Sequence, residues 1–336
     1  MSNIDRRLPL IDLHRHLDGN VRLETILEVG QRYGLELPAS DVEGLRSHVQ
    51  VTEPQPGVMA FIRKFYWMTR IMLNYEVCWR IAYENVQDAK AQGLDYVELR
   101  FSPLFMSQAH DLDPNGVVEA VCDGVAQGRR DFEMRVGLIG ILSRTYGPEM
   151  CWTELKALMS KPEQIIALDL AGDEARFPPE LFVDHFRAAK ELGWKITVHA
   201  GESAGSASIW KSIELLGAQR IGHAVSALDD GRLIEKMRME RIAIECNLTS
   251  NVQTSTVSSY ADHPLKRFMM ENLIATINTD DPGISGIDLA YEYEIAAPAA
   301  GLDRSQIRQL QINALEAAFL SEEEREIILQ AAAQRP

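Results

Sequence analysis

The sequence predicts a (β/α)8 barrel, in which eight parallel strands alternate with helices. Short apolar runs rich in β-branched residues recur along the chain, with amphipathic helical stretches between them. This alternation is typical of βαβ units, whose parallel sheet is covered on both faces. Polar residues gather just after these runs, where the strand ends of a barrel share one mouth. For the alternation alone, an open doubly wound sheet remains the competing architecture.

Eight apolar runs are expected to be strands. They are Pro9–Leu17, Tyr96–Phe101, Val136–Leu142, Ile165–Leu170, Lys195–His199, Arg220–His223, Ile242–Glu245 and Ile274–Asn278. Helical periodicity is clearest in the stretches Val77–Ala91, Pro179–Leu192 and Leu265–Glu271. Because barrels routinely exceed about 200 residues as one unit, we expect residues 1–336 to form a single domain.

The connection after the first predicted strand is long and contains an inserted helical segment. Its apolar residues recur at helical spacing, at Val58, Phe61, Ile62, Phe65, Met68 and Met72. An ordinary core-facing helix is the simpler interpretation. A helix inserted beside the mouth would also be placed to cover a substrate.

Composition and charge exclude several classes of partner. The chain carries 49 Asp and Glu against 34 Lys and Arg, a formal net charge of −15. Such a surface repels nucleic acid and anionic membranes, so a small neutral or cationic substrate fits better. Its 4 cysteines form no C-x-x-C pair, and Met1 to Arg7 is polar. We therefore expect a cytoplasmic protein without a disulfide framework.

The clearest chemical signal is the pair His14 and His16 in the first predicted strand. Side chains alternate along a strand, so residues two apart point the same way and can share one metal ion. Imidazole is the commonest metal ligand at neutral pH. A lone His-x-His pair is weak evidence, because such pairs also occur on solvated strands.

His199 and Asp280 follow the fifth and eighth predicted strands and complete a set of three imidazoles and one carboxylate. These ligand types suit Zn²⁺, one per chain, although Fe²⁺, Co²⁺ and Mn²⁺ share the preference. Such a metal lowers the pKa of a bound water and supplies hydroxide at neutral pH. Taken singly, His199 could be a core histidine and Asp280 a helix cap.

Three further polar residues end predicted strands beside this set. Glu202 follows Gly201, which permits a sharp turn, and is the natural general acid or base. His223 would hold or deprotonate the water, and Asp281 would bind substrate. The remaining histidines are expected at the surface, namely His48, His110, His185 and His263.

Several runs of the sequence resemble those of bacterial adenosine deaminases in the amidohydrolase superfamily, and together they span almost the whole chain. The runs begin at Leu13-His14-Arg15-His16, Tyr96-Val97-Glu98, Leu168-Asp169-Leu170, Thr197-Val198-His199, Arg220-Ile221-Gly222, Leu248-Thr249-Ser250, Ile277-Asn278-Thr279 and Ala296-Ala297-Pro298. The resemblance implies zinc-dependent deamination of adenosine and 2′-deoxyadenosine in purine salvage, by a monomer or weak homo-oligomer.

The resemblance also implies a role for each site residue. Zinc would be held by His14, His16, His199 and Asp280. Glu202 would protonate purine N1, while His223 and Asp280 orient the water. The nucleoside would be bound by the Gly172 backbone N–H, by Asp281 at N7, and by Asp18 with His16 at the ribose.

Two departures from the family pattern stand out. Ala224 follows His223 where glycine is usual, and Cys246 with Asn247 alters the segment after the seventh strand. They bear on efficiency and substrate preference.

Two other functions stay open. One is an adenine or modified-adenosine-nucleotide deaminase on the same barrel, although Asp18 leaves more room for a sugar than glutamate would. A nucleotide would need a cation at the mouth, and strand alternation points Arg15 away from it. The other is a non-catalytic binding protein on the same barrel, which retention of Glu202 and every proposed ligand argues against.

Overall fold

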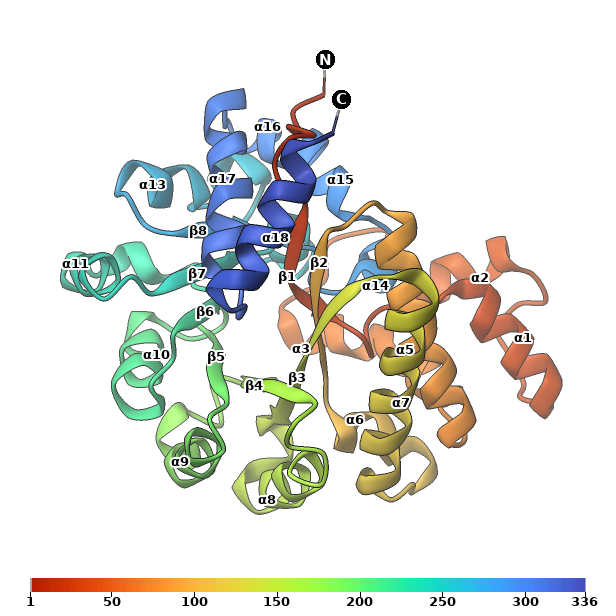
Figure 1. Cartoon of the computed structure of the whole chain (residues 1–336). Coiled ribbons are helices and arrows are strands. Elements are labelled where there is room, and N and C mark those ends of the chain that lie inside the picture. Colours follow the sequence, from red (N-terminus) through yellow and green to blue (C-terminus); the bar gives the residue numbers. More distant parts are fainter. Residues whose placement is uncertain (1, 336) are drawn as a thin grey trace.

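Eight parallel strands run around a common axis in the computed structural model, which describes residues 2–335 (Figure 1). The strands neighbour one another in sequence order. Their bounds are β1 Ile11–His16, β2 Tyr96–Phe101, β3 Arg135–Ser143, β4 Ile165–Ala171, β5 Lys195–Ala200, β6 Arg220–His223, β7 Ala243–Cys246 and β8 Ala275–Ile277. Each predicted strand is therefore present, with ends that differ by no more than two residues. The predicted (β/α)8 barrel is confirmed.

The seam between β1 and β8 is closed by residues of the predicted site. Arg15 and Asp280 form a parallel bridge there. The His16 amide donates to the Asp280 carbonyl at 2.7 Å, and the Asp280 amide donates to the His14 carbonyl at 2.8 Å. These backbone contacts bring together two predicted ligand segments from opposite ends of the chain.

Helices surround the strands (Figure 1). Their bounds are α1 Leu23–Tyr33, α2 Val42–Val49, α3 Val58–Ile62, α4 Tyr66–Arg70, α5 Tyr75–Ala91, α6 Pro103–Ser107, α7 Pro114–Phe132, α8 Gly147–Leu158, α9 Val183–Glu191, α10 Ser206–Lys211, α11 Gly231–Met239, α12 Leu248–Gln253, α13 Leu265–Met270, α14 Pro282–Ser285, α15 Leu289–Tyr291, α16 Ala297–Ala299, α17 Arg304–Ala317 and α18 Glu322–Ala333.

The predicted inserted helix is interrupted. A 3₁₀ turn, η1 (Arg63–Phe65), separates α3 from α4. The predicted apolar face is nevertheless present, because Phe61, Phe65 and Met68 are buried. Ile62 on the same face lines the cavity at the barrel mouth, so this segment covers the site.

The opposite end of the barrel is filled by buried ion pairs and covered by α17 and α18. Arg220 of β6 pairs with Glu98 and Glu245, and its guanidinium lies 3.6 Å from the ring centre of Phe319. The Phe319 amide in turn donates to Glu98 at 2.8 Å. Burying three charges requires such full pairing, and the C-terminal helices provide the cover.

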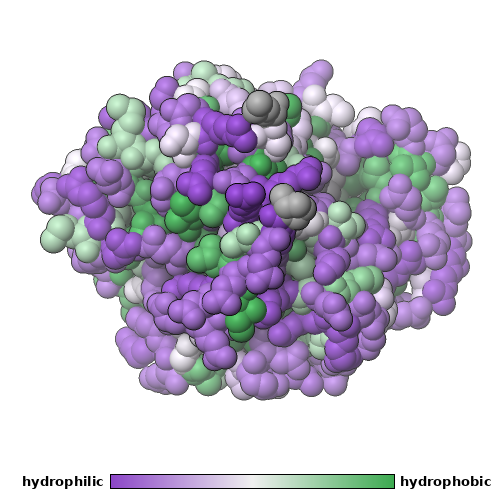
Figure 2. All heavy atoms as spheres, turned by 45° about the horizontal axis from the view of Figure 1, so that its top comes forward, coloured by the Kyte–Doolittle hydropathy of each residue, from purple (hydrophilic) through white to green (hydrophobic). Residues whose placement is uncertain are grey.

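The visible face in Figure 2 is mostly hydrophilic, with scattered apolar patches, as the acidic composition predicts. Cys78, Cys122, Cys151 and Cys246 are all buried as free thiols. Within residues 2–335, none of the helices has the length and apolarity needed to cross a membrane.

Candidate active site

Three imidazoles and one carboxylate converge at the mouth of the barrel. The Nε2 atom of His199 lies 3.0 Å from that of His14 and 3.3 Å from that of His16. Asp280 Oδ1 lies 3.1 Å from His14 Nε2 and 3.4 Å from His16 Nε2. The structure thus brings together the four residues that the sequence predicts as metal ligands.

Each of these imidazoles turns its other nitrogen to a carboxylate. His14 Nδ1 lies 2.7 Å from Glu245, His199 Nδ1 lies 3.0 Å from Asp169, and His16 Nδ1 lies 3.5 Å from Asp18. Carboxylates behind a histidine place its proton on Nδ1 and present the Nε2 lone pair, as at metal sites generally.

Arg100 fixes two of those carboxylates from below. Its guanidinium donates to Asp169 and to Glu245, each at 2.8 Å. All three side chains are completely buried. This pairing keeps both carboxylates ionised and in place beneath the imidazoles.

The site has more negative charge than its own residues balance. Burial acts to lower the pKa of His16, but the carboxylates of Asp281, Asp18 and Asp280 together raise it to about 9. Burial raises the pKa of Asp281 well above its usual range, and the neighbouring Asp280 and Asp18 add to this effect. A divalent cation would supply the missing positive charge, so the donor set and its electrostatics fit one.

Glu202 lies beside this cluster on the loop after β5, within a cavity that His199, His223 and Asp280 also line. Burial, opposed by His223 and reinforced by the Asp280 carboxylate, raises the pKa of Glu202 to about 7. A carboxyl group with such a pKa can both give and take a proton near neutral pH.

The loop that carries Glu202 is held by Glu174. The carboxylate of Glu174 accepts hydrogen bonds from four consecutive backbone amides, those of Gly201 at 2.6 Å, Glu202 at 3.2 Å, Ser203 at 2.9 Å and Ala204 at 3.0 Å. Gly201 has a φ of +69° and a Cβ there would lie 2.4 Å from Ile209, so glycine is required. The acid is therefore preorganised.

His223 completes the ring of side chains. It is 1% exposed, and its Nε2 faces Asp280 Oδ2 at 3.7 Å while its Nδ1 lies 3.7 Å from Glu202. His223 and Ala224 both adopt left-handed backbone, with φ of +64° and +52°. The alanine that departs from the family pattern thus occupies a position that favours glycine.

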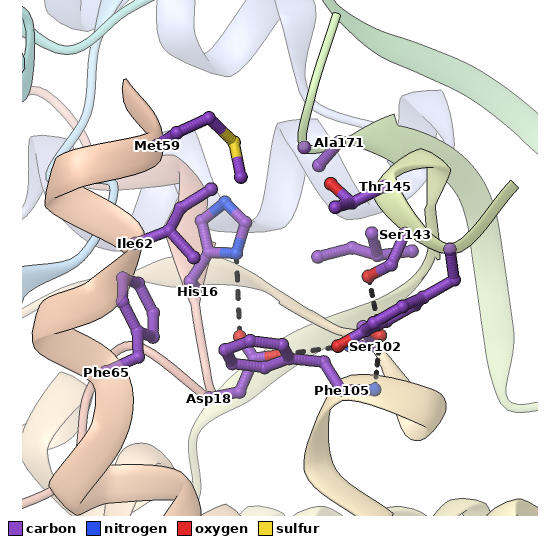
Figure 3. Close-up of a pocket in the computed structure, with 13 residues that line it drawn as sticks. His16, Asp18, Met59, Ile62, Phe65, Ser102, Phe105, Ser143, Thr145 and Ala171 are labelled. Atoms are coloured by element: carbon purple, nitrogen blue, oxygen red, sulfur yellow. Dashed lines mark hydrogen bonds and ion pairs between the residues drawn. The ribbon is translucent and has the colours of Figure 1, made fainter. Parts of the chain in front are cut away.

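A second cavity, drawn in Figure 3, shares His16, Ala171 and Gly172 with the first one. Asp18 lies at its floor and accepts a hydrogen bond from the Ser102 amide at 3.0 Å. Ser102 also contacts Ser143, with 2.9 Å between their hydroxyl oxygens.

Glu154 lies behind these hydroxyls. It accepts from the Ser102 hydroxyl and from the Ser143 amide. This end of the cavity therefore offers hydroxyl and carboxylate groups, beside the apolar rings of Phe65 and Phe105.

Gly172 and Asp281 also line the cavities. Gly172 has a φ of +108°, and a Cβ there would lie 2.4 Å from the Thr145 hydroxyl. Asp281 Oδ1 is buried without a hydrogen-bond partner among the described residues. Each of the substrate-binding residues proposed from the sequence thus lines the cavities.

Two histidine predictions are wrong. His185 and His263 are buried, although both were expected at the surface from their sequence context. His185 stacks on Trp152 with ring centres 4.1 Å apart, and His263 contacts Asn251 in the site. Their positions in helical and loop segments concealed this, since polarity alone does not show which side chains find buried partners.

The supporting carboxylates were missed as well. Glu245 and Glu154 carry no spacing motif, although an ionisable residue inside a buried strand, as Glu245 is, was an available signal. A grouping by distance also places His223 with His14, His199 and Asp280, one atom of each lying within 4.8 Å of the others. Distance alone does not decide between His16 and His223 as the third imidazole.

A (β/α)8 barrel with an imidazole–carboxylate cluster at its mouth defines a class of metal-dependent hydrolases. Residues 9–334 match the adenosine deaminase family model. The adenosine deaminase of Edwardsiella ictaluri is 55% identical over 325 residues, covering 97% of this chain and 98% of that one. The Klebsiella pneumoniae (strain 342) enzyme is 54% identical over 327 residues, with 97% and 98% covered. The chain belongs to the adenosine deaminase family.

Solved structures of lower identity share the fold. The adenine deaminase from Arthrobacter aurescens has a TM-score of 0.89 at 23% identity, covering 97% of this chain and 98% of that one. The N6-mAMP deaminase of Arabidopsis has a TM-score of 0.83 at 24% identity, covering 98% and 99%. At these identities the likeness concerns the barrel alone.

Proposed function

We propose that the barrel mouth holds one zinc ion through His14, His16, His199 and Asp280, and that Glu202 is the acid of the reaction. The reaction is the hydrolytic deamination of adenosine, which with water gives inosine and ammonia. The observation that carries the proposal is the position of Glu202 in the cavity that His199, His223 and Asp280 also line, beside three converging imidazoles. When bound, zinc lowers the pKa of a water molecule and supplies hydroxide at neutral pH.

The chemistry requires an acid opposite the nucleophile. An aromatic purine resists attack at C6 until a proton on N1 withdraws electrons from the ring. Glu202, with a pKa of about 7 and a loop anchored by Glu174, exchanges its proton near neutral pH and can supply it to N1. After attack, the same carboxylate can move a proton towards the departing amine.

The remaining polar groups would orient the nucleoside. The Gly172 backbone N–H is suited to donate to a purine ring nitrogen. The raised pKa of Asp281 favours its protonated form, whose unpartnered carboxyl group can donate to N7. Asp18 and His16, joined at 3.5 Å, would contact the ribose. The apolar side chains of Ile62 and Phe65 exclude water from the ring.

The cavity favours a nucleoside over a nucleotide or a free base. Among the described residues that line the two cavities there is no lysine or arginine to bind a phosphate. Arg15 is completely buried on the outer side of β1, where it donates to Gln92 at 2.8 Å. The hydroxyl-rich cavity beyond Asp18 provides room and partners for a sugar, and 2′-deoxyadenosine should be accepted too.

A comparison of substrates on the metal-loaded protein tests the proposal. We expect kcat/KM for adenosine and 2′-deoxyadenosine to exceed that for adenine and AMP by at least about 10³-fold, because adenine lacks the sugar that Asp18 would bind and the described lining of the two cavities holds no lysine or arginine for the phosphate of AMP. Metal analysis should find one zinc per chain. Comparable rates for adenine or AMP would overturn the nucleoside assignment, and active protein free of metal would overturn the zinc assignment.

A further inference from the structure

A chain of hydrogen bonds runs from the backbone of α13 to His223. The Leu265 amide lies 3.1 Å from His263 Nδ1, and His263 Nε2 lies 3.2 Å from Asn251 Oδ1. Asn251 Nδ2 in turn lies 3.0 Å from His223 Nδ1. All three side chains are buried, so solvent does not compete for these contacts.

The contact between the Leu265 amide and His263 determines which group is the donor in each of the other hydrogen bonds. Leu265 is the first residue of α13, and a backbone N–H at that position has no partner within its helix and can only donate. His263 Nδ1 must therefore accept, which places the ring proton on Nε2. Burial lowers the pKa of His263 to about 3, in agreement with a neutral ring.

The donor and acceptor roles at His263 also fix the orientation of the Asn251 side-chain amide. Because His263 Nε2 carries hydrogen, the amide must turn its oxygen to His263 and its NH₂ group to His223. A flipped amide would set N–H against N–H at His263. His223 Nδ1 consequently accepts, and the proton of the neutral His223 ring lies on Nε2.

We propose that His263, through Asn251, is a positioning residue that fixes His223 as the Nε2–H tautomer, so that His223 donates to the attacking water and stays outside the metal ligand set. This inference rests on the proposed function of the site. His14, His16 and His199 have the opposite arrangement, because each turns Nδ1 to a carboxylate. The distances alone do not show which imidazoles are ligands. The tautomers do, because His223 differs in its tautomer from the three proposed ligands.

Other neighbours of His223 do not reverse this assignment. Asn247 Nδ2 lies 3.3 Å from Nδ1 and 3.5 Å from Nε2, so it contacts the ring less closely than Asn251 does. Glu202 lies 3.7 Å from Nδ1, beyond hydrogen-bonding distance. Nε2 faces Asp280 Oδ2, also at 3.7 Å, where a donor is favourable.

The assignment decides what His223 does with the water. A neutral imidazole with its proton on Nε2 has no lone pair there, so it cannot take a proton from a water on that side. It can hold the water oxygen by donation. Removal of the proton then falls to Asp280, the carboxylate on the same side.

A nuclear magnetic resonance measurement on the zinc-loaded protein labelled with ¹⁵N-histidine tests the tautomer directly. The signals of His223 are assigned by their loss in His223→Gln. We expect the Nε2–H pattern for His223 and the Nδ1–H pattern for His14, His16 and His199. An Nδ1–H pattern for His223 would overturn the inference. This readout needs no substrate, so it is independent of whether adenosine is deaminated.

Asn251→Asp reverses the polarity with little change of shape. A carboxylate accepts from both rings, so His223 should gain a proton on Nδ1. We expect kcat to fall about 10- to 100-fold, the usual effect of losing such an outer partner, with KM within about twofold and zinc content unchanged. An unchanged tautomer together with unchanged kcat would contradict the proposal.

His263→Phe and His185→Phe form a matched pair of buried-histidine variants. Within the described part of the chain, His185 has no hydrogen bond to a site residue, and its Nε2 lies 2.8 Å from the Pro148 carbonyl oxygen. We expect His263→Phe to lower kcat about 10-fold. The ¹⁵N signals of His223 should then show a mixture of the two tautomers. His185→Phe should leave both unchanged. Equal effects of the two substitutions on kcat would show a merely structural role and overturn the proposal.

Discussion

Gly222 of β6 lies against the ring of His14, so close that a Cβ atom at residue 222 would be 2.9 Å from His14 Cε1. The nearest backbone atom, His199 Cα, would be only 3.5 Å away. His14 cannot retreat, because its Nδ1 is held at 2.7 Å by Glu245. The absence of a side chain at residue 222 therefore sets the position of a proposed ligand.

Gly222→Ala should displace His14 and weaken metal binding. We expect at least a 10-fold lower zinc affinity, and a similar loss of kcat/KM at limiting zinc, because disturbing the groups that orient a metal ligand typically costs about 10- to 100-fold. Chelator competition measures the affinity. Gly231→Ala, where a Cβ would meet nothing within 4 Å, is the control and should match the parent protein. Unaltered zinc affinity in Gly222→Ala would show that the ring has room to move.

Glu202→Gln should abolish proton transfer while leaving the metal site intact. General acid–base catalysis is worth about 10²–10⁴-fold, and we expect kcat to fall by at least that factor. Zinc content and melting temperature should stay close to those of the parent. His199→Ala, by contrast, should lose both zinc and activity. If Glu202→Gln turned over adenosine at the parental rate, the acid would have to be another group.

Glu154 should make the stability of the protein fall as pH rises. Burial raises its pKa from 4.5 to about 8, so the folded protein keeps the proton that the unfolded chain releases. The stabilisation is complete below pH 4.5 and is lost as pH rises towards 8. Thermal melts should therefore show a smaller decrease between pH 5 and 9 in Glu154→Gln than in the parent.

Glu149→Gln is the control for that experiment, because Glu149 is an exposed glutamate on the same helix, α8. It should reproduce the parental pH dependence. A parallel decrease in all three proteins would mean that Glu154 does not titrate in this range.

Ala224→Gly should stabilise the protein. Ala224 is fully buried with a φ of +52°, and a left-handed conformation costs a non-glycine residue about 1–2 kcal/mol. Part of this gain is offset by the greater freedom of glycine in the unfolded chain, so we expect a net increase of about 0.5–1 kcal/mol in the free energy of unfolding.

Denaturant melts of Ala224→Gly and Ala227→Gly provide the comparison. Ala227 is equally buried and lies in the 3₁₀ turn η6 (Ala227–Asp229), where glycine should be destabilising. A decrease in stability for both variants would show that residue 224 bears no strain.

The barrel could be predicted from the sequence because strands that are buried on both faces appear as continuous apolar runs. β2 and β6 coincide with the predictions, and Ser102, Glu202, His223 and Asp280, which were placed at strand ends, do line the cavities at the mouth. The supporting groups were harder to foresee. Glu245 reaches His14 only through the closure of the barrel, and Glu154 reaches Ser102 only through the packing of α8.

The burial of His263 was also not predictable from the local sequence. A histidine in a loop is usually solvated, and only the packing against α12 of the segment just before α13 buries this one beside Asn251. Likewise, the apolar spacing of Val58 to Met72 predicts which face is buried but not the 3₁₀ turn that interrupts the helix. Local patterns carry such information only for residues whose partners are near in sequence.

The seam between β1 and β8 has a consequence for how the protein is made. His14 and His16 leave the ribosome early, whereas Asp280, whose backbone bonds to theirs, is synthesised near the end of the chain. A nascent chain that ends before β8 therefore holds only part of the donor set. The complete proposed donor set therefore exists only after the last strand has docked, so tight retention of a metal ion through Asp280 would report that the barrel has closed.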